Sequence, residues 1–235
     1  MSHTPKNLVL ATVLMLTAVV GATSSTSAAP PGPTADYRFN DNLKSSVHKE
    51  SIPSLIKVGN GFVYATKNVK GKTDTVLAWP KGSGLKLKTA KKAVGSKADY
   101  TIAMLVRLIE VEAYGKLVDF EDRTSESGFY VVERFLHPYG VYASPTRPEE
   151  PPFVAGRWHQ VVMTRVGLNV KGYVDGERYF IADDSTIEFD LGFDEILHFL
   201  IDDEAGADEE TGGEIARLRI WKDPLTDHQA KNLKL

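Results

Sequence analysis

The sequence of 235 residues contains no cysteine. This absence excludes disulfide bonds, thiol catalysis, and zinc or iron–sulfur sites with cysteine ligands. The chain also lacks a large excess of either charge, because 28 Lys and Arg residues stand against 31 Asp and Glu residues, for a net charge of −3. We therefore expect no nucleic acid partner. With 42% hydrophobic and 25% charged residues the composition is globular, and the length suits one large domain or two small ones.

Residues 1–28 are predicted to be a signal peptide. Lys6 precedes a run of apolar residues, alanine and threonine over 8–20, which has the length of a signal-peptide hydrophobic region and is short for a membrane span. Thr26-Ser27-Ala28 then fits a small-x-small cleavage pattern, with cutting after Ala28. A retained N-terminal anchor is the alternative. We expect a secreted or cell-envelope protein whose mature chain has no integral membrane segment, and whose stability must come from its core because disulfides are absent.

The mature chain has the pattern of a β protein. Residues 29–35 form a Pro- and Gly-containing flexible lead, and short runs rich in Val, Ile, Tyr and Phe follow, separated by Gly, Asn, Asp and Pro. Asp175-Gly176 between two such runs predicts a hairpin, and Thr226 with Gln229 predicts the capping box of a short C-terminal helix. The pattern favours an antiparallel sandwich or barrel. The predicted strands cover 37–39, 62–64, 76–79, 85–87, 99–108, 116–120, 129–132, 140–142, 158–165, 169–174, 178–181, 196–201 and 214–221.

Several segments resemble one known family in their order and spacing. Trp158-His-Gln-Val-Val-Met-Thr-Arg165, followed by Gly172-Tyr-Val-Asp-Gly176, is similar to the core of laminin-G-like domains, which belong to the concanavalin A-like lectin/glucanase superfamily. The ending Gly213-Glu-Ile-Ala-Arg-Leu-Arg-Ile-Trp221 resembles the last strand of that family. Residues 77–87 and 199–213 resemble exported bacterial members. The likeness spans residues 36–235, so we identify one domain there.

The resemblance implies an all-β, antiparallel two-sheet jelly-roll sandwich with a short C-terminal helix. It also implies loops and a concave face that bind glycan or protein, and a frequent structural calcium ion. One position departs from the family, because the last strand carries Ala216 where an aspartate often helps to hold the ion.

Acidic residues gather late in the chain. From 183 to 214 there are 13 Asp and Glu residues and no Lys or Arg. Because calcium takes six to eight oxygen ligands, Asp202, Asp203 and Glu209 are the predicted calcium ligands. The spacing is not that of an EF-hand, since position 12 counted from Asp202 is Gly213. A solvated acidic loop is the alternative.

Lysines gather earlier in the chain. Residues 67–97 hold nine lysines and only one acid, Asp74. Such a region can attract an acidic polysaccharide or a phosphate-rich polymer. The alternative, which we favour, is that lysines on strand edges prevent edge-to-edge pairing of sheets.

Aromatic rings between 125 and 152 are candidates for sugar stacking. We expect Phe129, Tyr130 and Tyr142 to fill the core. His137-Pro138-Tyr139-Gly140 has the composition of a turn, so Tyr139 is the ring expected to be exposed, and His137 and Tyr139 are the predicted ligand-binding residues. Trp79 and Trp221 stand inside apolar runs and are expected to be buried.

Catalytic motifs are incomplete. Jelly-roll glycoside hydrolases use a Glu-x-Asp-x-(x)-Glu strand, and neither Glu188-Phe-Asp190 nor Glu110-Val-Glu112 is followed by the third acid. There is no Gly-x-Ser-x-Gly motif, and the six histidines form no His-x-x-x-His or His-Glu-x-x-His pattern. A triad assembled from distant residues stays open.

Three hypotheses follow. The leading one is an exported, non-catalytic module that binds carbohydrate or a cell-surface or extracellular partner, assisted by calcium. The alternatives are a glycan-cleaving enzyme on the same fold and a structural or adhesive surface protein.

Overall fold

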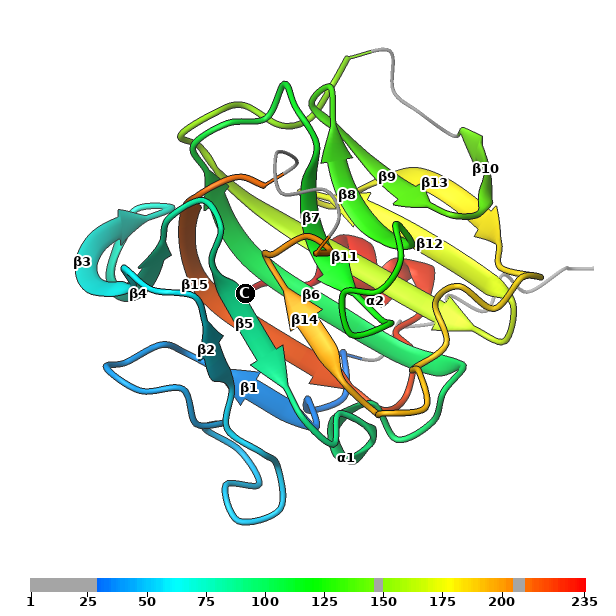
Figure 1. Cartoon of the computed structure of the whole chain (residues 1–235), viewed down its shortest axis with the longest axis horizontal. Helices are drawn as coiled ribbons and strands as arrows, with labels where there is room; N and C mark the ends of the chain where they lie inside the picture. The colour runs from blue at the N-terminus through cyan, green and yellow to red at the C-terminus, as the bar shows by residue number, and fades with distance from the viewer. Residues whose placement is uncertain (1–28, 146–149, 205–209) are drawn as a thin grey trace, which may run out of the picture.

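Two antiparallel β-sheets form the molecule (Figure 1), described here from a computed structural model over residues 29–145, 150–204 and 210–235. The predicted signal peptide, residues 1–28, lies outside the described residues. The nine-stranded sheet has the order β10-β13-β12-β11-β6-β15-β4-β3, with β1 also paired to β15, and the six-stranded sheet has the order β2-β5-β14-β7-β8-β9. The predicted all-β two-sheet sandwich is confirmed. Within the described ranges, no helix is long and apolar enough to cross a membrane.

The elements have the following bounds: β1 Ala35–Tyr37, β2 Ile56–Val58, β3 Val63–Val69, β4 Lys72–Trp79, β5 Gly84–Leu87, α1 Lys91–Val94, β6 Asp99–Leu108, β7 Gly115–Asp119, β8 Gly128–Val132, β9 Phe135–Tyr139, β10 Tyr142–Pro145, β11 Trp158–Val166, β12 Asn169–Val174, β13 Glu177–Asp183, β14 Leu197–Phe199, β15 Gly213–Trp221 and α2 Asp227–Asn232.

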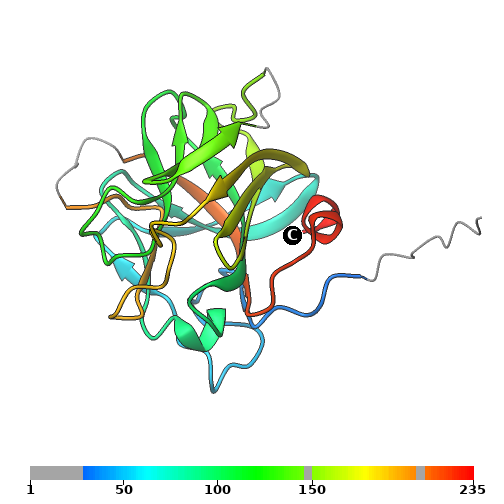
Figure 2. The same ribbon diagram turned by 90° about the vertical axis from the view of Figure 1, so that its right-hand side faces the viewer.

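The core lies between the sheets, and alternation along the strands decides what enters it. In β6, Ile102 and Met104 face the other sheet in the main hydrophobic cluster. Ala103, between them, points to the outside and packs with Trp221 and Leu233 in a second cluster under α2. Figure 2 shows α2 on the side of the nine-stranded sheet that faces away from the six-stranded sheet. The central strand is therefore buried on both faces, which explains its nearly continuous apolar sequence.

Two local predictions are confirmed. Asp175 and Gly176 have φ values of 49° and 91°, which a type I′ hairpin turn requires. Thr226 accepts a hydrogen bond from the backbone N–H of Gln229, and the Gln229 side chain accepts one from the backbone N–H of Thr226, which completes the capping box of α2. Trp79 and Trp221 are buried as expected.

The segment around His137 differs from the prediction. His137–Gly140 was expected to turn, but His137 and Tyr139 lie in strand β9. Pro138 is tolerated there because β9 is the edge strand of its sheet, where the missing N–H breaks no ladder. The turn comes later, at Gly140 with φ of 92°, so the strand predicted over 140–142 is wrong. Tyr142 begins β10 and is 87% exposed, so it is not a core residue.

The N-terminal segment is bound to the last strand. Ala35 begins β1 and pairs with Ile220 of β15. The Trp221 indole N–H donates to the Pro31 carbonyl at 2.8 Å, and the Thr34 N–H donates to the Ile220 carbonyl at 2.8 Å. Within the flexible lead predicted over 29–35, Ala35 therefore belongs to a strand, and Pro31 and Thr34 are hydrogen-bonded to β15.

A buried carboxylate joins β1 to β15. Asp36 is 2% exposed and receives two hydrogen bonds from Arg217, at 2.8 and 2.7 Å, with Arg219 and Arg38 nearby. Burial by itself would raise the pKa of Asp36, but the hydrogen bond and charge of Arg217, together with Arg219 and Arg38, lower it from 3.8 to about 2. The ionised carboxylate is thus part of the native fold.

Replacing Asp36 should show that the stability of the fold depends on its ionised carboxylate. Since the folded pKa lies below the unfolded one, the stabilisation is complete above about pH 4 and is lost as the pH falls through about 2. We expect Asp36→Asn to lower the free energy of unfolding by about 3 kcal/mol at pH 7, as measured by urea denaturation. The difference in this free energy between the unchanged protein and the variant, here called the gap, should be smaller at pH 2.5. The exposed Asp74→Asn variant is the control, with a change within about 0.5 kcal/mol. A gap of equal size at both pH values would contradict the ionic origin.

Candidate functional site

The outer face of the six-stranded sheet carries polar side chains in two rows. Residues directly opposite each other on antiparallel strands share a face. Lys116 of β7 therefore stands beside Tyr130 of β8, which stands beside His137 of β9. Asp119 of β7 stands beside His198 of β14, which in turn stands beside Lys86 of β5. The neighbours of Tyr130 in its strand, Phe129 and Val131, belong to the core cluster on the inner face.

A β-bulge in β7 brings Lys116 and Asp119 to the same face. In regular alternation, residues three apart in a strand point to opposite faces. The register of β7 against β8 shifts between Lys116 and Val118, and Leu117 and Val118 both enter the core. Asp119 is thereby turned outward beside Lys116, with 2.9 Å between Lys116 Nζ and Asp119 Oδ2.

Lys116 is at the centre of a buried charged cluster. Its ammonium group lies 2.9 Å from Asp119 Oδ2, 3.3 Å from Asp202 Oδ1 and 3.8 Å from Asp203 Oδ2, and it donates to the Ser125 carbonyl at 2.9 Å. The side chains of Lys116, Asp119 and Asp202 have no exposed surface, and that of Asp203 is 3% exposed. The predicted residues Asp202 and Asp203 thus come together, but around an ammonium group.

Tyr130 completes the floor of this cluster. Its hydroxyl donates to Asp202 Oδ1 at 2.8 Å, and its ring lies 5.0 Å from Lys116 Nζ. Burial raises the pKa of Tyr130, and the charge of Asp202 raises it further. Tyr130 is 1% exposed, so the prediction that it is buried is right. Its surroundings are the charged outer face and not the apolar core.

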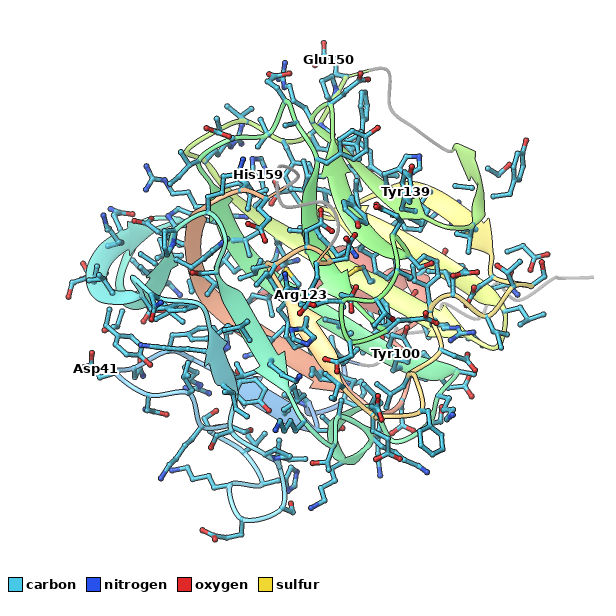
Figure 3. All side chains as sticks on the ribbon, in the orientation of Figure 1. Asp41, Tyr100, Arg123, Tyr139, Glu150 and His159 are labelled. Atoms are coloured by element: carbon cyan, nitrogen blue, oxygen red, sulfur yellow. The ribbon has the colours of Figure 1, made fainter. Side chains whose placement is uncertain are left out.

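Two chain segments cover the face. The segment 120–127 folds back because Asp119 Oδ1 accepts hydrogen bonds from the backbone N–H groups of Glu121, at 3.1 Å, and Arg123, at 2.8 Å. Arg123 then bonds to the main-chain carbonyls of Asp202 and Asp203 in the second segment, which follows β14. Figure 3 shows Arg123 over the middle of the sheet, on the side facing the viewer.

A second charged group lies at the row formed by Asp119, His198 and Lys86. Asp122 accepts from Lys86 at 2.9 Å and from the His198 ring at 2.7 Å. Burial raises the pKa of Asp122, but the hydrogen bonds from Lys86 and His198 outweigh it and hold the pKa below its ordinary value. Burial lowers the pKa of His198 despite its bond to Asp122. These contacts give the segment 120–127 a further attachment to the sheet.

Tyrosine rings form a platform at the edge of the same face. Tyr114 and Tyr139 are 39% and 38% exposed, and their rings meet edge to face, with centroids 6.3 Å apart and planes at 84°. Tyr130 lies 5.5 Å from Tyr139 and 6.4 Å from Tyr114, and His137 lies 6.1 Å from Tyr139. The predicted exposure of Tyr139 is confirmed in the structure (Figure 3).

The structure therefore joins two predictions made separately. Tyr139 and His137 lie on one side of Tyr130, and Asp202 lies on the other. Neither Tyr114 nor Lys116 was predicted from the sequence to be a site residue. Lys116 lies in a predicted strand, but nothing in the sequence there indicates a buried charge.

The calcium prediction is only partly covered by the structure. Asp202 and Asp203 are placed, whereas Glu209 lies outside the described residues. Across residues 29–145, 150–204 and 210–235, no group of three His, Cys, Asp or Glu side chains is arranged to hold a metal ion. Asp202 and Asp203 by themselves do not fit calcium, because the ammonium group of Lys116 already faces them and would repel the ion.

The carboxylate pairs considered for catalysis are separated or occupied. Glu188 and Asp190 lie in the segment between β13 and β14 and not on a strand. Glu188 accepts a hydrogen bond from Ser127, while Asp190 pairs with Arg165. Glu110 and Glu112 follow β6 and are both exposed. Neither pair provides two facing carboxylates on one strand.

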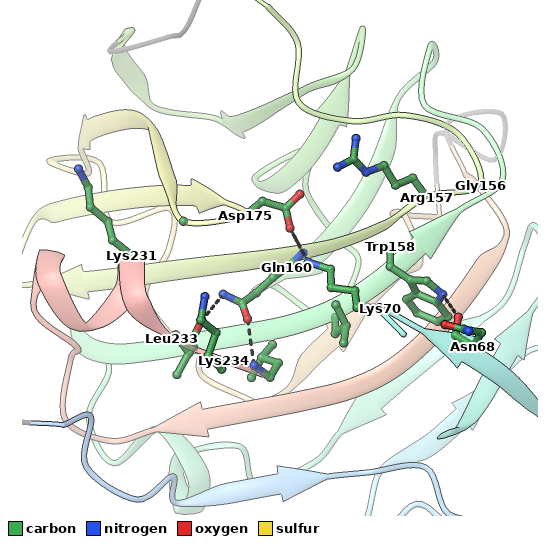
Figure 4. Close-up of a pocket in the computed structure, with 13 residues that line it drawn as sticks. Asn68, Lys70, Gly156, Arg157, Trp158, Gln160, Asp175, Lys231, Leu233 and Lys234 are labelled. Carbon is green, nitrogen blue, oxygen red and sulfur yellow. Dashed lines mark hydrogen bonds and ion pairs between the residues drawn. The ribbon is translucent and has the colours of Figure 1, made fainter. Parts of the chain in front are cut away.

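A cavity of ≈ 700 Å³ lies on the opposite side of the molecule, against the outer face of the nine-stranded sheet (Figure 4). Its lining includes Lys70, Arg157, Lys231 and Lys234, and Asp175 is its one acidic side chain. Asp175 pairs with Lys70 at 2.8 Å, whereas the ion pairs of the described residues include none of the other three cations. This basic pocket has the charge for an anionic ligand and holds none of the predicted site residues.

The basic pocket is held in shape by the end of the chain. The side-chain amide of Gln160 donates to the Leu233 carbonyl at 2.9 Å and accepts from the Leu235 N–H at 3.0 Å. The Trp158 indole N–H donates to the Asn68 carbonyl at 3.1 Å. The dashed lines in Figure 4 mark these bonds. The residues after α2 thus form one wall of the pocket and β11 forms its floor.

Solved structures of known proteins share this fold. Domain 4 of AbnA, an extracellular GH43 arabinanase of Geobacillus stearothermophilus, solved in complex with arabinotriose, matches with a TM-score of 0.63 and 18% identity over 85% of this chain and 97% of that domain. The binding domain of botulinum neurotoxin DC, in complex with rat synaptotagmin II, matches at 0.54 and 12% over 85% of this chain and 50% of its own. That of serotype G matches at 0.57 and 11%, again over 85% and 50%.

At these identities the likeness shows the fold alone, and the chain corresponds to about half the length of the toxin domains. A search of curated protein sequences finds no match. The sequence profile of one laminin G family matches residues 81–231, which is more than half of the chain. The two-sheet sandwich and this match agree, and the chain belongs to that laminin G family within the concanavalin A-like lectin/glucanases superfamily.

Proposed function

We propose that this protein is a non-catalytic carbohydrate-binding module that binds its ligand on the outer face of the six-stranded sheet. The observation that carries the proposal is the platform of Tyr114 and Tyr139, two partly exposed rings fixed edge to face beside a set of carboxylates. Aromatic surfaces pack against the C–H faces of sugar rings, and nearby polar groups orient the ligand.

The polar groups needed for sugar hydroxyls lie close to the platform. The Glu126 side chain is exposed, and its remaining burial together with the negative charges of Asp203 and Asp202 raises its pKa. His137 is half-buried next to Tyr139. A carboxylate accepts hydrogen bonds from two hydroxyls at once, and an imidazole can donate or accept. The platform can thus stack a sugar ring while Glu126 and His137 orient it.

The complexes of similar structures support a binding role. The arabinanase domain was solved with arabinotriose. Cell entry of botulinum neurotoxin type C, which matches this chain at 13% identity and a TM-score of 0.56, is dependent upon interaction with two ganglioside molecules. We extend to this chain only the class of ligand, a carbohydrate, and take arabinotriose as the first probe.

The charges near the platform argue against hydrolysis. Glycosidases place two carboxyl groups about 5–9 Å apart on either side of the substrate bond. Asp119 and Asp202 lie near enough to each other, since both contact Lys116, but both side chains are fully buried and face its ammonium group. A substrate cannot reach them. We therefore infer a module without catalysis, exported by the signal peptide proposed for residues 1–28 and binding its carbohydrate ligand outside the cytoplasm.

Removing either exposed ring should weaken binding. We expect Tyr139→Ala and Tyr114→Ala each to weaken binding of arabinotriose, or of the best ligand in a glycan array, about 5- to 10-fold, since an aromatic contact contributes about 1–1.5 kcal/mol. Isothermal titration calorimetry measures the dissociation constant. Tyr142→Ala is the matched control, because Tyr142 is 87% exposed on β10 and lies outside the platform.

Two results would contradict the proposal. One is a Tyr139→Ala variant that binds as tightly as the unchanged protein. The other is a glycan array with no binding at millimolar protein, which would favour the structural or adhesive alternative. Release of reducing ends from a bound glycan would instead revive the enzymatic alternative.

The basic pocket supports a second candidate, binding of an acidic polysaccharide. Arg157, Lys231 and Lys234 are exposed on its rim, and Trp158 and Leu233 give it an apolar surface. A uronic acid carries both a carboxylate for the cations and a ring for the apolar wall.

Charge removal tests this second candidate. We expect Arg157→Ala/Lys234→Ala to weaken binding of oligogalacturonate at least about 10-fold at low salt while leaving arabinotriose binding unchanged. Lys88→Ala/Lys92→Ala removes the same charge from exposed positions elsewhere and serves as the control. Equal losses in both double variants would mean that only overall charge matters.

A further inference from the structure

We propose that the ammonium group of Lys116 serves as the built-in cation of the binding face and does there the work expected of a calcium ion. Lys116 is then a positioning residue, which fixes the segments around the tyrosine platform. This role of Lys116 is independent of whether the platform binds carbohydrate.

The oxygen atoms around Lys116 are of the kind that a calcium ion takes. Three carboxylates and one main-chain carbonyl surround its Nζ atom, at 2.9, 3.3 and 3.8 Å for Asp119, Asp202 and Asp203 and 2.9 Å for Ser125. Calcium binds the same chemical groups at about 2.3–2.6 Å. The two distances of 2.9 Å, to Asp119 and to the Ser125 carbonyl, are those of charge-assisted hydrogen bonds from an ammonium group.

Burial makes a cation necessary at this place. Ionised carboxylates removed from water are destabilising by several kcal/mol each unless a positive charge compensates them. Another cation close by, Arg123, donates to the main-chain carbonyls of Asp202 and Asp203, and no ion pair of the described residues joins it to their carboxylates. Asp202 Oδ2 is buried without a hydrogen-bond partner among the described residues. Lys116 is therefore the cation that faces all three acids.

Lys116 also joins pieces of chain that are far apart in sequence. It extends from β7, two residues after Tyr114, and reaches Ser125 in the segment 120–127 and Asp202 beyond β14. Asp202 in turn holds the hydroxyl of Tyr130, whose ring supports Tyr139. A change at Lys116 should thus reach the platform through these contacts.

Calcium-dependent melting tests the proposal on the full-length mature protein. We expect the thermal midpoint of the unchanged protein to be the same in millimolar calcium and in chelator, because an ion that binds only the native state would raise it. Lys116→Met keeps all but the last atom of the side chain's length and removes its charge, so its midpoint should fall by more than about 6 °C. Lys86→Met is the matched control, a lysine on the same face with one carboxylate partner that is 33% exposed, and should lose far less.

A shorter side chain at position 116 allows a measurement that a change in packing alone would not affect, namely the effect of calcium on the thermal midpoint. Lys116→Ala leaves room among the carboxylates, so we expect calcium to raise its midpoint by several degrees while the unchanged protein stays constant. Should the single variants fail to fold, Lys116→Met/Asp202→Asn is measured instead, and removal of one acid should restore folding or recover part of the lost midpoint.

Three outcomes would overturn the inference. A midpoint of the unchanged protein that calcium raises relative to chelator would show a resident metal ion. A Lys116→Met midpoint equal to that of the unchanged protein would show that the charge is dispensable. A double variant no more stable than Lys116→Met would assign to Lys116 a packing role only. Absence of glycan binding would contradict the proposed function and leave this inference intact.

Discussion

The buried ion group around Lys116 is the constraint on which the six-stranded sheet depends. Its outer face turns charged side chains toward two covering segments, so each carboxylate must find a positive partner inside the protein. The segment 120–127 and the residues after β14 are held over the sheet by this group, with Arg123 binding their main chains together. The position of the tyrosine platform follows from the same contacts, since Tyr130 and Asp202 belong to both.

The outer faces of the two sheets are covered by different kinds of contact. The nine-stranded sheet is covered by α2 and the residues after it, which bury Ala103 and Trp221 under Leu233 through apolar contact. The six-stranded sheet is covered by ionic and hydrogen-bonded contacts. Apolar contact has no preferred direction, whereas charged contacts fix particular side chains at particular places. The face with charged contacts is therefore the better suited to orient a ligand, and the predicted site residues that the structure describes lie there, namely His137, Tyr139, Asp202 and Asp203.

Much of the fold could be predicted from local pattern, and the site only in part. The continuous apolar run of β6 and the Asp175-Gly176 turn are local signals, and the structure has both. Strand β9 was missed because Pro138 usually marks a turn, and only its position at a sheet edge makes it tolerable. Lys116 was missed for another reason. Its face is set by a bulge, and its partners come from segments that the sequence does not show to be near.

The pairing of β1 with β15 bears on the order in which the molecule can form. Ala35 pairs with Ile220, so β1 cannot join the sheet before β15 is present. Contacts between such distant residues form slowly, because a long loop must close before they give any stabilisation. Until β15 arrives, β6 and β4 also lack the strand that lies between them in the finished sheet. A chain shortened before β15 therefore has no route to the native state, and folding of this domain is completed only after β15 has been made.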